Sequence, residues 1–414
     1  MRVCFDTFGC RLNKAEALQM EADYIAKGWK VVTEHKDADL FVVRGCSVTA
    51  RAQRECEKLI AHLRRRYPTI PIRICGCLES KSEKSATVAR AIAAAQAATQ
   101  TTAAEDGDAV PVRTARAYLK VQDGCAGTCT FCIVPQFRGK SSSVPFTDVM
   151  DKAKKFLDAG YSEIVVTGCN LALYASDGQR LPELLSQIAT LAADAGARIR
   201  LGSLEPGDCA LETVHAMAEH RNVCRFLHVP VQSGSNRILM SMKRPYDIRD
   251  VETLVSNAAK LMPALGIGCD LMTGFPGESE LDFRATQGLL KRLPFNNGHI
   301  FPYSERPGTL AAGLSGKVDK ATRSLRAHSL AELVATKRMR YAKQFIGHTV
   351  EVVVEDSRKC EGWTSEYLRC RAVGTAERRS LAKMFVTKVH HDALLEGRLL
   401  FKADTSGKGR PTAP

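Results

Sequence analysis

The stretch "VQDGCAGTCTFCIVPQFRG", residues 121–139, places Cys125, Cys129 and Cys132 in the spacing C-x3-C-x2-C, with no fourth cysteine in the same run. The segment "YLKVQ" just before the cysteines predicts a strand, so we expect the three thiols on a loop at its C-terminal end. Zinc sites favour paired cysteines and closure by a fourth ligand, and none lies at a suitable spacing. Three thiolates can instead hold an iron–sulfur cluster with one open iron. We therefore favour a cluster over the alternatives of a zinc knuckle and inert loop thiols.

The length and charge of the chain limit its architecture and its partners. With 414 residues it is long enough for two or three domains. Its net charge of +14 favours a polyanionic partner, with nucleic acid ahead of an anionic membrane surface. The fifteen cysteines, and a start "MRVCFDTFGC" without a signal-peptide pattern, predict a cytoplasmic protein whose clustered cysteines bind metal or catalyse. No apolar run reaches the roughly 20 residues of a membrane span, so we expect no membrane association.

The first part of the chain, residues 1–112, predicts a parallel α/β domain. The apolar runs "VCFDTFGC", "ADLFVVRGC" and "IRICGC" alternate with helical patterns over about 14–27 and 51–66. The Ala- and Thr-rich residues that end this part predict a helix followed by a flexible linker.

The rest of the chain predicts two further domains, and the fold class is α/β overall. Residues 113–345 predict a (β/α)6 partial or closed barrel with a basic helical extension over 317–343, because six strand patterns are each followed by a helical pattern. Residues 346–402 predict a small all-β barrel, and 403–414 a disordered tail. The six strand patterns are "YLKVQ", "EIVVTG", "RIRLGS", "RFLHVP", "IGCDLMTG" and "HIFPYS".

A second, dispersed set of cysteines lies in the N-terminal part. Cys10, Cys46 and Cys77 each follow a glycine just past a predicted parallel strand. Loops after neighbouring parallel strands converge at one crevice, so the three thiols could meet there. Spacing alone leaves a metal role and chance equally open. Cys4 and Cys75 inside strands and Cys56 inside a helix fit small buried hydrophobic residues instead.

The first triplet, with Phe131 directly before its last cysteine, resembles the motif of the radical S-adenosylmethionine (SAM) superfamily. The resemblance implies a 4Fe-4S cluster on Cys125, Cys129 and Cys132 whose open iron is chelated by SAM. An electron from that cluster would cleave the sulfonium and give a 5′-deoxyadenosyl radical, which side chains alone cannot generate.

Polar residues follow three further strands of the predicted barrel, where the loops converge on the same mouth. Glycine there permits close backbone approach, and Glu205 and Gln232 could bind the ammonium or the ribose of SAM. For any one loop, an ordinary strand-ending turn is an equal alternative. Beside Phe131, the predicted cofactor contacts are Gly168, Asn170, Ser203, Glu205 and Gln232, with Thr167, His228, Ser233 and Gly234 in the same loops.

The segments "TFGCRLNKAEA" and "GCSVTARA" and the "GC" at 76–77 resemble the N-terminal domain of the methylthiotransferases, a radical SAM family. The resemblance implies that Cys10, Cys46 and Cys77 hold a second 4Fe-4S cluster, which carries the sulfur. The C-terminal segment "EGWTSEYL" resembles a TRAM domain, an RNA-binding barrel. The implied enzyme is a sulfur-containing group transferase that replaces an unactivated C–H bond by C–SCH3.

The implied substrate is a modified tRNA adenosine. The segments "GCRLNKAEA", "SLEP" and "FPYSERPGTLAA" most resemble the branch acting on carbon 2 of N6-threonylcarbamoyladenosine (t6A) at position 37. The alternatives are the same reaction on N6-isopentenyladenosine (i6A) 37, methylthiolation of a ribosomal-protein aspartate, and a non-catalytic iron–sulfur RNA-binding protein. The partners implied are the tRNA anticodon stem-loop and a reductant such as flavodoxin or ferredoxin, and we expect a monomer. RNA contact is expected from the basic helix and from Arg358, Lys359, Trp363, Tyr367, Arg369 and Arg371.

Four segments depart from the usual family pattern, and they concern substrate choice and the N-terminal fold rather than the six cysteines. Arg44-Gly45 stands before Cys46 where Asn-Thr is common, and Leu78-Glu79 follows Cys77 where an aromatic residue and Ala-Gln often stand. The segment "RGKSSS" at 138–143 replaces a more arginine-rich run. The Ala-rich stretch at 84–104 lacks the strand that normally closes the first domain.

Overall fold

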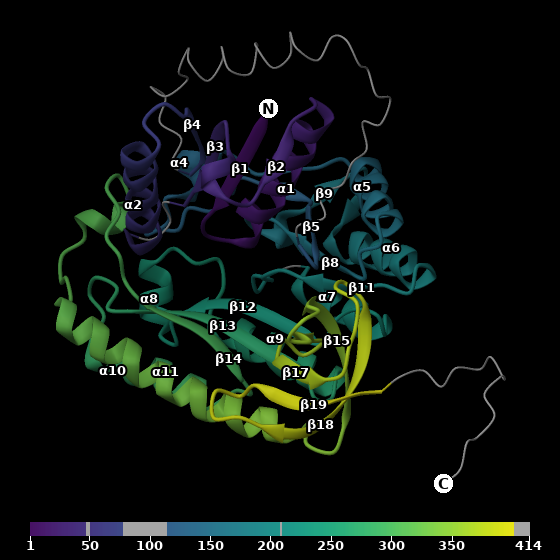
Figure 1. Cartoon of the computed structure of the whole chain (residues 1–414). Helices are drawn as coiled ribbons and strands as arrows, with labels where there is room; N and C mark the ends of the chain where they lie inside the picture. The colour runs from purple at the N-terminus through teal and green to yellow at the C-terminus, as the bar shows by residue number, and fades with distance from the viewer. Residues whose placement is uncertain (47–49, 78–113, 208, 401–414) are drawn as a thin grey trace, which may run out of the picture.

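The computed structural model describes residues 1–46, 50–77, 114–207 and 209–400 (Figure 1). Its N-terminal part is a four-stranded parallel sheet in the order β2-β1-β3-β4, which confirms the predicted parallel α/β arrangement. The short strand β2 and the 3-10 turn η1 were not predicted, because segments of three residues carry no recognisable period. The elements are β1 (Arg2–Thr7), α1 (Arg11–Ala26), β2 (Lys30–Val32), η1 (His35–Asp37), β3 (Leu40–Gly45), α2 (Ala50–Arg66) and β4 (Ile72–Gly76).

One helix covers each face of this sheet. Successive strand residues point to opposite faces. Phe5 therefore meets Tyr24 of α1, with ring centroids 5.6 Å apart, whereas Cys4 and Phe41 pack with Leu63 of α2. All strands run in one direction, so the three loops that carry the dispersed cysteines leave the same edge. The three cysteines predicted to be small hydrophobic residues are buried, namely Cys4, Cys56 and Cys75.

The central part is a six-stranded partial barrel built from two parallel sheets, in the orders β11-β8-β5 and β12-β13-β14. Parallel bridges from Ile199 to Val223 and from Ser203 to His228 join the two sheets. Among the described residues β5 and β14 are not paired, so the barrel is open there and the closed-barrel alternative is wrong. The six predicted strands are confirmed as β5 (Ala117–Lys120), β8 (Glu163–Thr167), β11 (Arg198–Leu201), β12 (Phe226–Gln232), β13 (Gly266–Thr273) and β14 (Asn297–Pro302).

Helices cover the outer face of the partial barrel (Figure 1). Outward-pointing strand residues such as Leu119, Ile164 and Leu227 are fully buried in the main hydrophobic core. The residues between them point inward, and several are charged, among them Glu163 and Asp270. The interior is therefore suited to polar ligands. The helices are α4 (Val134–Arg138), α5 (Phe146–Asp158), α6 (Leu181–Asp194), α7 (Ala210–Glu219), α8 (Asn236–Ser241), α9 (Ile248–Leu261), α10 (Glu280–Arg292) and α11 (Lys320–Lys343), with the 3-10 turns η2 (Leu171–Leu173) and η3 (Leu310–Gly313) and the short strands β6 (Gln122–Asp123), β7 (Ser142–Ser143), β9 (Ala175–Ser176) and β10 (Gln179–Arg180).

The C-terminal part is a closed five-stranded barrel in the order β15-β16-β17-β19-β18, which confirms the predicted all-β module. Its core also contains Tyr341, Ala342 and Phe345 at the end of α11, so that helix connects the two barrels. Figure 1 shows α11 running along β14 toward the yellow C-terminal strands. The strands are β15 (Thr349–Asp356), β16 (Glu361–Thr364), β17 (Arg369–Val373), β18 (Leu381–Val389) and β19 (Leu395–Leu400).

Two buried arginines fix the C-terminal barrel to the N-terminal ends of the central strands. Arg198 donates to the carbonyl oxygen of Trp363 at 2.9 Å, and Arg200 donates to that of Thr364 at 2.8 Å. The carboxylate of Glu163 lies between the two guanidinium groups, at 2.7 and 2.8 Å, and is fully buried. The C-terminal barrel therefore closes the base of the central one.

The expectation that Trp363 and Tyr367 stack on RNA bases is wrong. Their rings stack on each other with centroids 4.5 Å apart, and Tyr367 also stacks on Phe226 of β12 at 4.6 Å. The indole N–H of Trp363 donates to the Glu355 carboxylate at 3.0 Å. These aromatic rings therefore join the two barrels and are only partly exposed. Of the six residues of this module expected to contact RNA, the four basic ones are exposed, namely Arg358, Lys359, Arg369 and Arg371.

The basic helix α11 has a larger structural role than its charge predicts. Arg326 is buried and forms an ion pair with Glu278 at 2.6 Å. The ammonium group of Lys337 donates to the carbonyl oxygen of Leu293, just past the end of α10, at 2.5 Å. These side chains are not available to RNA phosphates. The basic residues of α11 that are exposed are Lys320, Arg340 and Lys343.

Three expectations lie outside the described residues: the Ala-rich helix and linker with the 84–104 stretch, the Leu78-Glu79 departure, and the tail at 403–414. Within the described part of the chain, no helix combines the length and the apolar character that crossing a membrane requires.

Candidate active site

The tight cysteine triplet lies on the loop between β6 and α4, just beyond β5, where the sequence predicted a loop. Gly124 has a φ of +64°, and a Cβ there would lie 1.9 Å from the carbonyl oxygen of Lys140. Only glycine fits this close return of the chain. The N–H of Cys125 closes the same loop by donating to the carbonyl oxygen of Gly139 at 3.2 Å.

The three thiols of this loop are partly exposed and influence one another. The pKa of Cys132 is raised to about 11, mainly by burial and to a lesser extent by the neighbouring Cys129 and Cys125. A bound metal offsets that penalty, because it stabilises the thiolate form. In the described part of the chain, the only groups of three ligand atoms within 4.8 Å of one another are two His-containing sets, not this triplet. Three thiolates on one loop suit an iron–sulfur cluster with one open iron.

Arg244, in the loop after α8, connects the cysteine loop to two of the predicted cofactor contacts. Its guanidinium group donates to the sulfur of Cys129 at 3.1 Å and forms an ion pair with Glu205. Glu205 also accepts a hydrogen bond from the side chain of Asn170. The sequence did not reveal Arg244 because its partners come from distant strands, and the only local signal was its place in "MKRPY".

Gln122 is a second residue that the sequence did not single out. It is fully buried, accepts from the N–H of Asn170 at 2.9 Å and donates to the carbonyl oxygen of Gly124 at 2.8 Å. A Cβ at Gly168 would lie 2.9 Å from its side-chain oxygen. The close approach predicted at Gly168 is therefore made by Gln122, which ties the loop after β8 to the cysteine loop.

Gln232, at the end of β12, offers an unused hydrogen-bond acceptor. It is 7% exposed, and its side-chain oxygen has no hydrogen-bond partner among the described residues. Its backbone is held at a φ of +66°, an uncommon value for a residue with a side chain. A buried unpaired amide oxygen fits a donor group of a ligand such as SAM. Of the other predicted contacts, Ser203 is exposed beside β12, and Phe131 packs edge-on against Phe275 with centroids 6.5 Å apart.

The dispersed cysteines lie on three loops that meet at the C-terminal edge of the N-terminal sheet. A Cβ at Gly9, whose φ is +91°, would lie 2.6 Å from the Cβ of Cys46. The N–H of Cys77 donates to the last carbonyl group of β3 at 3.2 Å. The buried side chain of Asn13 donates to carbonyl groups of the β1 and β3 loops, at 2.8 and 3.1 Å. Cys10 is exposed at the start of α1, whereas Cys46 and Cys77 are buried.

A network of charged side chains joins the two cysteine regions. Glu16 of α1 accepts hydrogen bonds from Arg138 at 3.0 Å and Lys120 at 2.8 Å, and it forms an ion pair with Arg44. Burial raises the pKa of Glu16, but these three cations keep it below the usual value. Arg138 also donates to Asn13 at 2.8 Å. Arg44, one of the departures from the family pattern, thus supplies a cation to the contact between domains.

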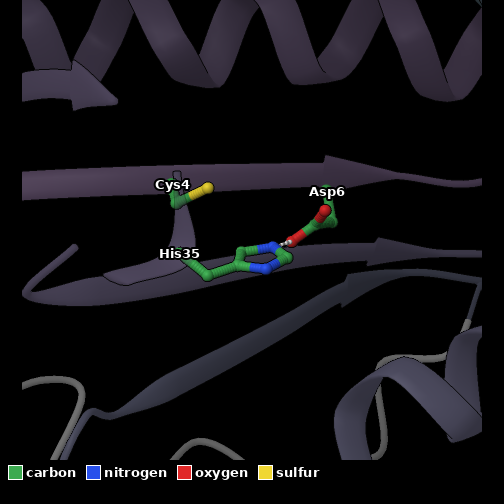
Figure 2. A group of neighbouring side chains, drawn as sticks. All are labelled: Cys4, Asp6 and His35. Carbon is green, nitrogen blue, oxygen red and sulfur yellow. Dashed lines mark hydrogen bonds and ion pairs between the residues drawn. The ribbon is translucent and has the colours of Figure 1, made fainter. Parts of the chain in front are cut away.

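The N-terminal sheet contains another group of possible metal ligands, Cys4, Asp6 and His35 (Figure 2). The imidazole of His35 contacts the Asp6 carboxylate at 2.9 Å and packs edge-on against Phe41. The thiol of Cys4 is buried and lies 3.8 Å from the carbonyl oxygen of Thr33. A hydrogen bond between His35 and Asp6 beside β1 accounts for this group without a metal.

Comparisons with known proteins identify the family to which the chain belongs. The pattern of the radical SAM superfamily matches residues 119–290, and that of the uncharacterized protein family UPF0004 matches residues 2–97. The threonylcarbamoyladenosine tRNA methylthiotransferase MtaB of Thermotoga maritima is 32% identical over 377 residues, covering 85% of this chain and 86% of the relative. The chain belongs to the radical SAM methylthiotransferases.

A second relative of this methylthiotransferase, the tRNA-2-methylthio-N(6)-dimethylallyladenosine synthase of Methylacidiphilum infernorum, is 28% identical and covers 86% of this chain and 85% of the relative. Among solved structures, the radical SAM methyltransferase TsrM of Kitasatospora setae matches with a TM-score of 0.53 and 14% identity, over 75% of each chain. That likeness concerns the fold alone and agrees with the predicted partial barrel. The family makes this chain an enzyme that transfers a sulfur-containing group and uses SAM and 4Fe-4S clusters, so the non-catalytic alternative is wrong.

Proposed function

We propose that this enzyme inserts a methylthio group at carbon 2 of t6A at position 37 of tRNA. In this proposal Cys125, Cys129 and Cys132 hold the cluster that cleaves SAM, and Cys10, Cys46 and Cys77 hold the cluster that carries sulfur. The observation that carries it is the bridge between the two cysteine regions. Asn13, which ties the loops of Cys10 and Cys46, accepts a hydrogen bond from Arg138, which follows Cys132 by six residues. One substrate position can therefore lie next to both clusters.

The bound clusters and SAM supply a carbon radical and a sulfur unit. The substrate hydrogen at carbon 2 is not acidic, so the chain needs no general base for it. The side chains instead bind and orient. Arg244 places a positive charge against Cys129, and Glu205 and the unpaired oxygen of Gln232 would accept from donor groups of bound SAM.

Two features favour t6A over i6A as the substrate. The relative from Thermotoga maritima carries the t6A activity in its name. The threonyl group of t6A also ends in a carboxylate, which suits a polar interior, whereas the isopentenyl group of i6A is a hydrocarbon and would suit an apolar one. Aspartate of a ribosomal protein is a third candidate, but the relatives compared above are tRNA enzymes by name.

The proposal includes the domain and partner expectations. Residues 1–112, 113–345 and 346–402 act as the sulfur-carrying domain, the radical domain and the RNA-binding module. The exposed Arg358 and Lys359 of that module contact the anticodon stem-loop. A flavodoxin or ferredoxin delivers the electron to a cytoplasmic, monomeric enzyme.

Nucleoside mass spectrometry tests the substrate directly. We expect tRNA from cells that lack the gene to lose 2-methylthio-t6A while t6A accumulates. An unchanged 2-methylthio-t6A peak would contradict the proposal. Loss of 2-methylthio-i6A instead would identify i6A as the substrate.

A further inference from the structure

Three polar side chains inside the partial barrel have no role in the chemistry described above: His228 of β12, Asp270 of β13 and His299 of β14. We propose that His299 and Arg11, with His299 held by Asp270 and His228, form an anion subsite that binds the carboxylate on the N6 substituent of the substrate adenosine. This inference rests on the proposed function, and its test distinguishes a failure of the subsite from a failure of the proposed function.

The three side chains come from adjacent strands and share one carboxylate oxygen. His228 Nε2 lies 3.1 Å, and His299 Nδ1 3.4 Å, from the same oxygen of Asp270. Asp270 and His299 are direct neighbours in the register of β13 and β14. A Cβ at Gly268 would lie 2.7 Å from Nδ1 of His228, so the imidazole of His228 lies against β13. The residues on either side of His228 are buried in the outer core, which turns its own side chain inward.

The exposures of the two histidines differ in a way that assigns their roles. The side chain of His228 is 12% exposed, whereas that of His299 is 81% exposed although β14 is a wall of the barrel. His299 therefore faces an open interior, and since its Nδ1 faces Asp270, its Nε2 is the end directed away from that carboxylate. A carboxylate on one imidazole nitrogen favours the protonated ring, whose other nitrogen is then a charged donor.

The charges around the group favour that protonated form. The hydrogen bond to Asp270 and the charge of that carboxylate raise the pKa of His299, against a smaller opposing effect of the nearby Arg11. Burial raises the pKa of Asp270, but the hydrogen bonds from both histidines outweigh burial and keep it below the usual value. Asp270 is thus an anion that orients His299.

A second cation reaches the same interior from the N-terminal domain. The guanidinium group of Arg11 lies 5.3 Å from the ring centroid of Tyr367, which stacks on Phe226, two residues before His228 on β12. Arg11 directly follows Cys10, one of the proposed ligands of the sulfur-carrying cluster. The subsite would therefore hold the N6 substituent close to the place where sulfur is delivered.

An anion fits this group better than a metal ion does. Two histidines and an aspartate could ligate a divalent cation, and their ligand atoms lie within 4.8 Å of one another. Arg11, however, lies near enough to affect the pKa of His299, and its charge repels a cation and attracts a carboxylate. The test must therefore distinguish anion binding from zinc binding.

The experiment uses the full chain with both clusters reconstituted and three anticodon stem-loops, which carry t6A37, the methyl ester of t6A37, or i6A37. For the wild type we expect kcat/KM on the t6A ester to be about 10- to 100-fold lower than on t6A, because the ester loses a hydrogen bond between charged groups. His299→Gln and Arg11→Gln should each lower kcat/KM on t6A by a similar factor, about 10- to 100-fold, and leave that on the ester nearly unchanged. His328→Gln is the matched control, because His328 is exposed on α11 and faces Glu332 at 3.2 Å.

Release of 5′-deoxyadenosine without RNA should be the same in all variants, which shows that the fold and the SAM-cleaving cluster are intact. If His299→Gln lowers the rate equally on t6A and on its ester, His299 has only a structural role and the subsite is refuted while the proposed function stands. If the wild type uses i6A and not t6A, the proposed function itself fails. If the wild type retains one equivalent of zinc that His299→Gln loses, the group is a metal site and the proposal is overturned.

Discussion

Glu16 lies at the contact between the N-terminal and central domains, so Glu16→Gln gives a sharp prediction. The Glu16 side chain is 14% exposed and accepts from or pairs with Arg138, Lys120 and Arg44. Glutamine keeps the size but removes the negative charge that the three cations share, although Lys120 and Arg138 keep Asp123 as a second partner, at 2.5 and 3.0 Å. Removing one partner of a buried ion pair costs about 3–5 kcal/mol. Because Lys120 is 26% exposed, we expect the lower end, about 3 kcal/mol.

Tryptophan fluorescence during urea unfolding measures this loss. The chain contains two tryptophans, and Trp29 is buried in the N-terminal sheet while Trp363 lies in the C-terminal barrel. In a Trp363→Phe background, Glu16→Gln should move the transition reported by Trp29 to lower urea. Glu34→Gln, which replaces an exposed carboxylate of the same domain, is the control.

The pH dependence of this loss has a defined sign. The pKa of Glu16 is lowered in the folded state, so its contribution is fully present above the unfolded value near 4.5 and disappears as the pH falls through the folded value. The difference between variant and wild type should therefore shrink in acid. An unchanged midpoint at neutral pH, or a difference that persists in acid, would refute the assignment of Glu16 as the anion at this contact.

Three further substitutions test other parts of the site. Replacing the three dispersed cysteines with alanine should lower bound iron by about half and stop sulfur insertion while 5′-deoxyadenosine is still released, and unchanged iron would contradict a second cluster. Gln232→Leu should raise the KM for SAM by about 10-fold with no loss of thermal stability, because the oxygen it removes has no partner within the described protein. If the KM stays the same, that oxygen does not meet SAM. Trp363→Ala should destabilise the chain by about 3 kcal/mol through loss of its stacking on Tyr367, and a fall in tRNA affinity at unchanged stability would restore the RNA-stacking role.

The strands, the cysteine loops and the parallel sheet could be predicted because each depends on local sequence. An apolar run followed by a polar loop identifies β5, β8 and β13 one at a time, and parallel strands bring their loops to one edge. The convergence of Cys10, Cys46 and Cys77 at the edge of one sheet follows from that rule, and the structure brings their three loops together there.

The long-range contacts of the site could not be predicted, because they join residues far apart in the chain. Arg244 meets Cys129 across 115 positions, and Glu16 meets Arg138 across 122. Aromatic and basic composition also failed to separate an RNA surface from a domain interface, since Trp363 and Tyr367 would suit either. Only the packing against Phe226 decides between them.

The buried arginines of β11 affect the order in which this enzyme folds during its synthesis. Arg198 and Arg200 donate to carbonyl groups of residues synthesised 165 and 164 positions later, respectively. While the ribosome is still translating the central strands, the base of their barrel lacks these partners. These contacts can therefore form only after β16 has emerged. A nascent chain stalled before residue 361 should be held by chaperones at that unfinished end.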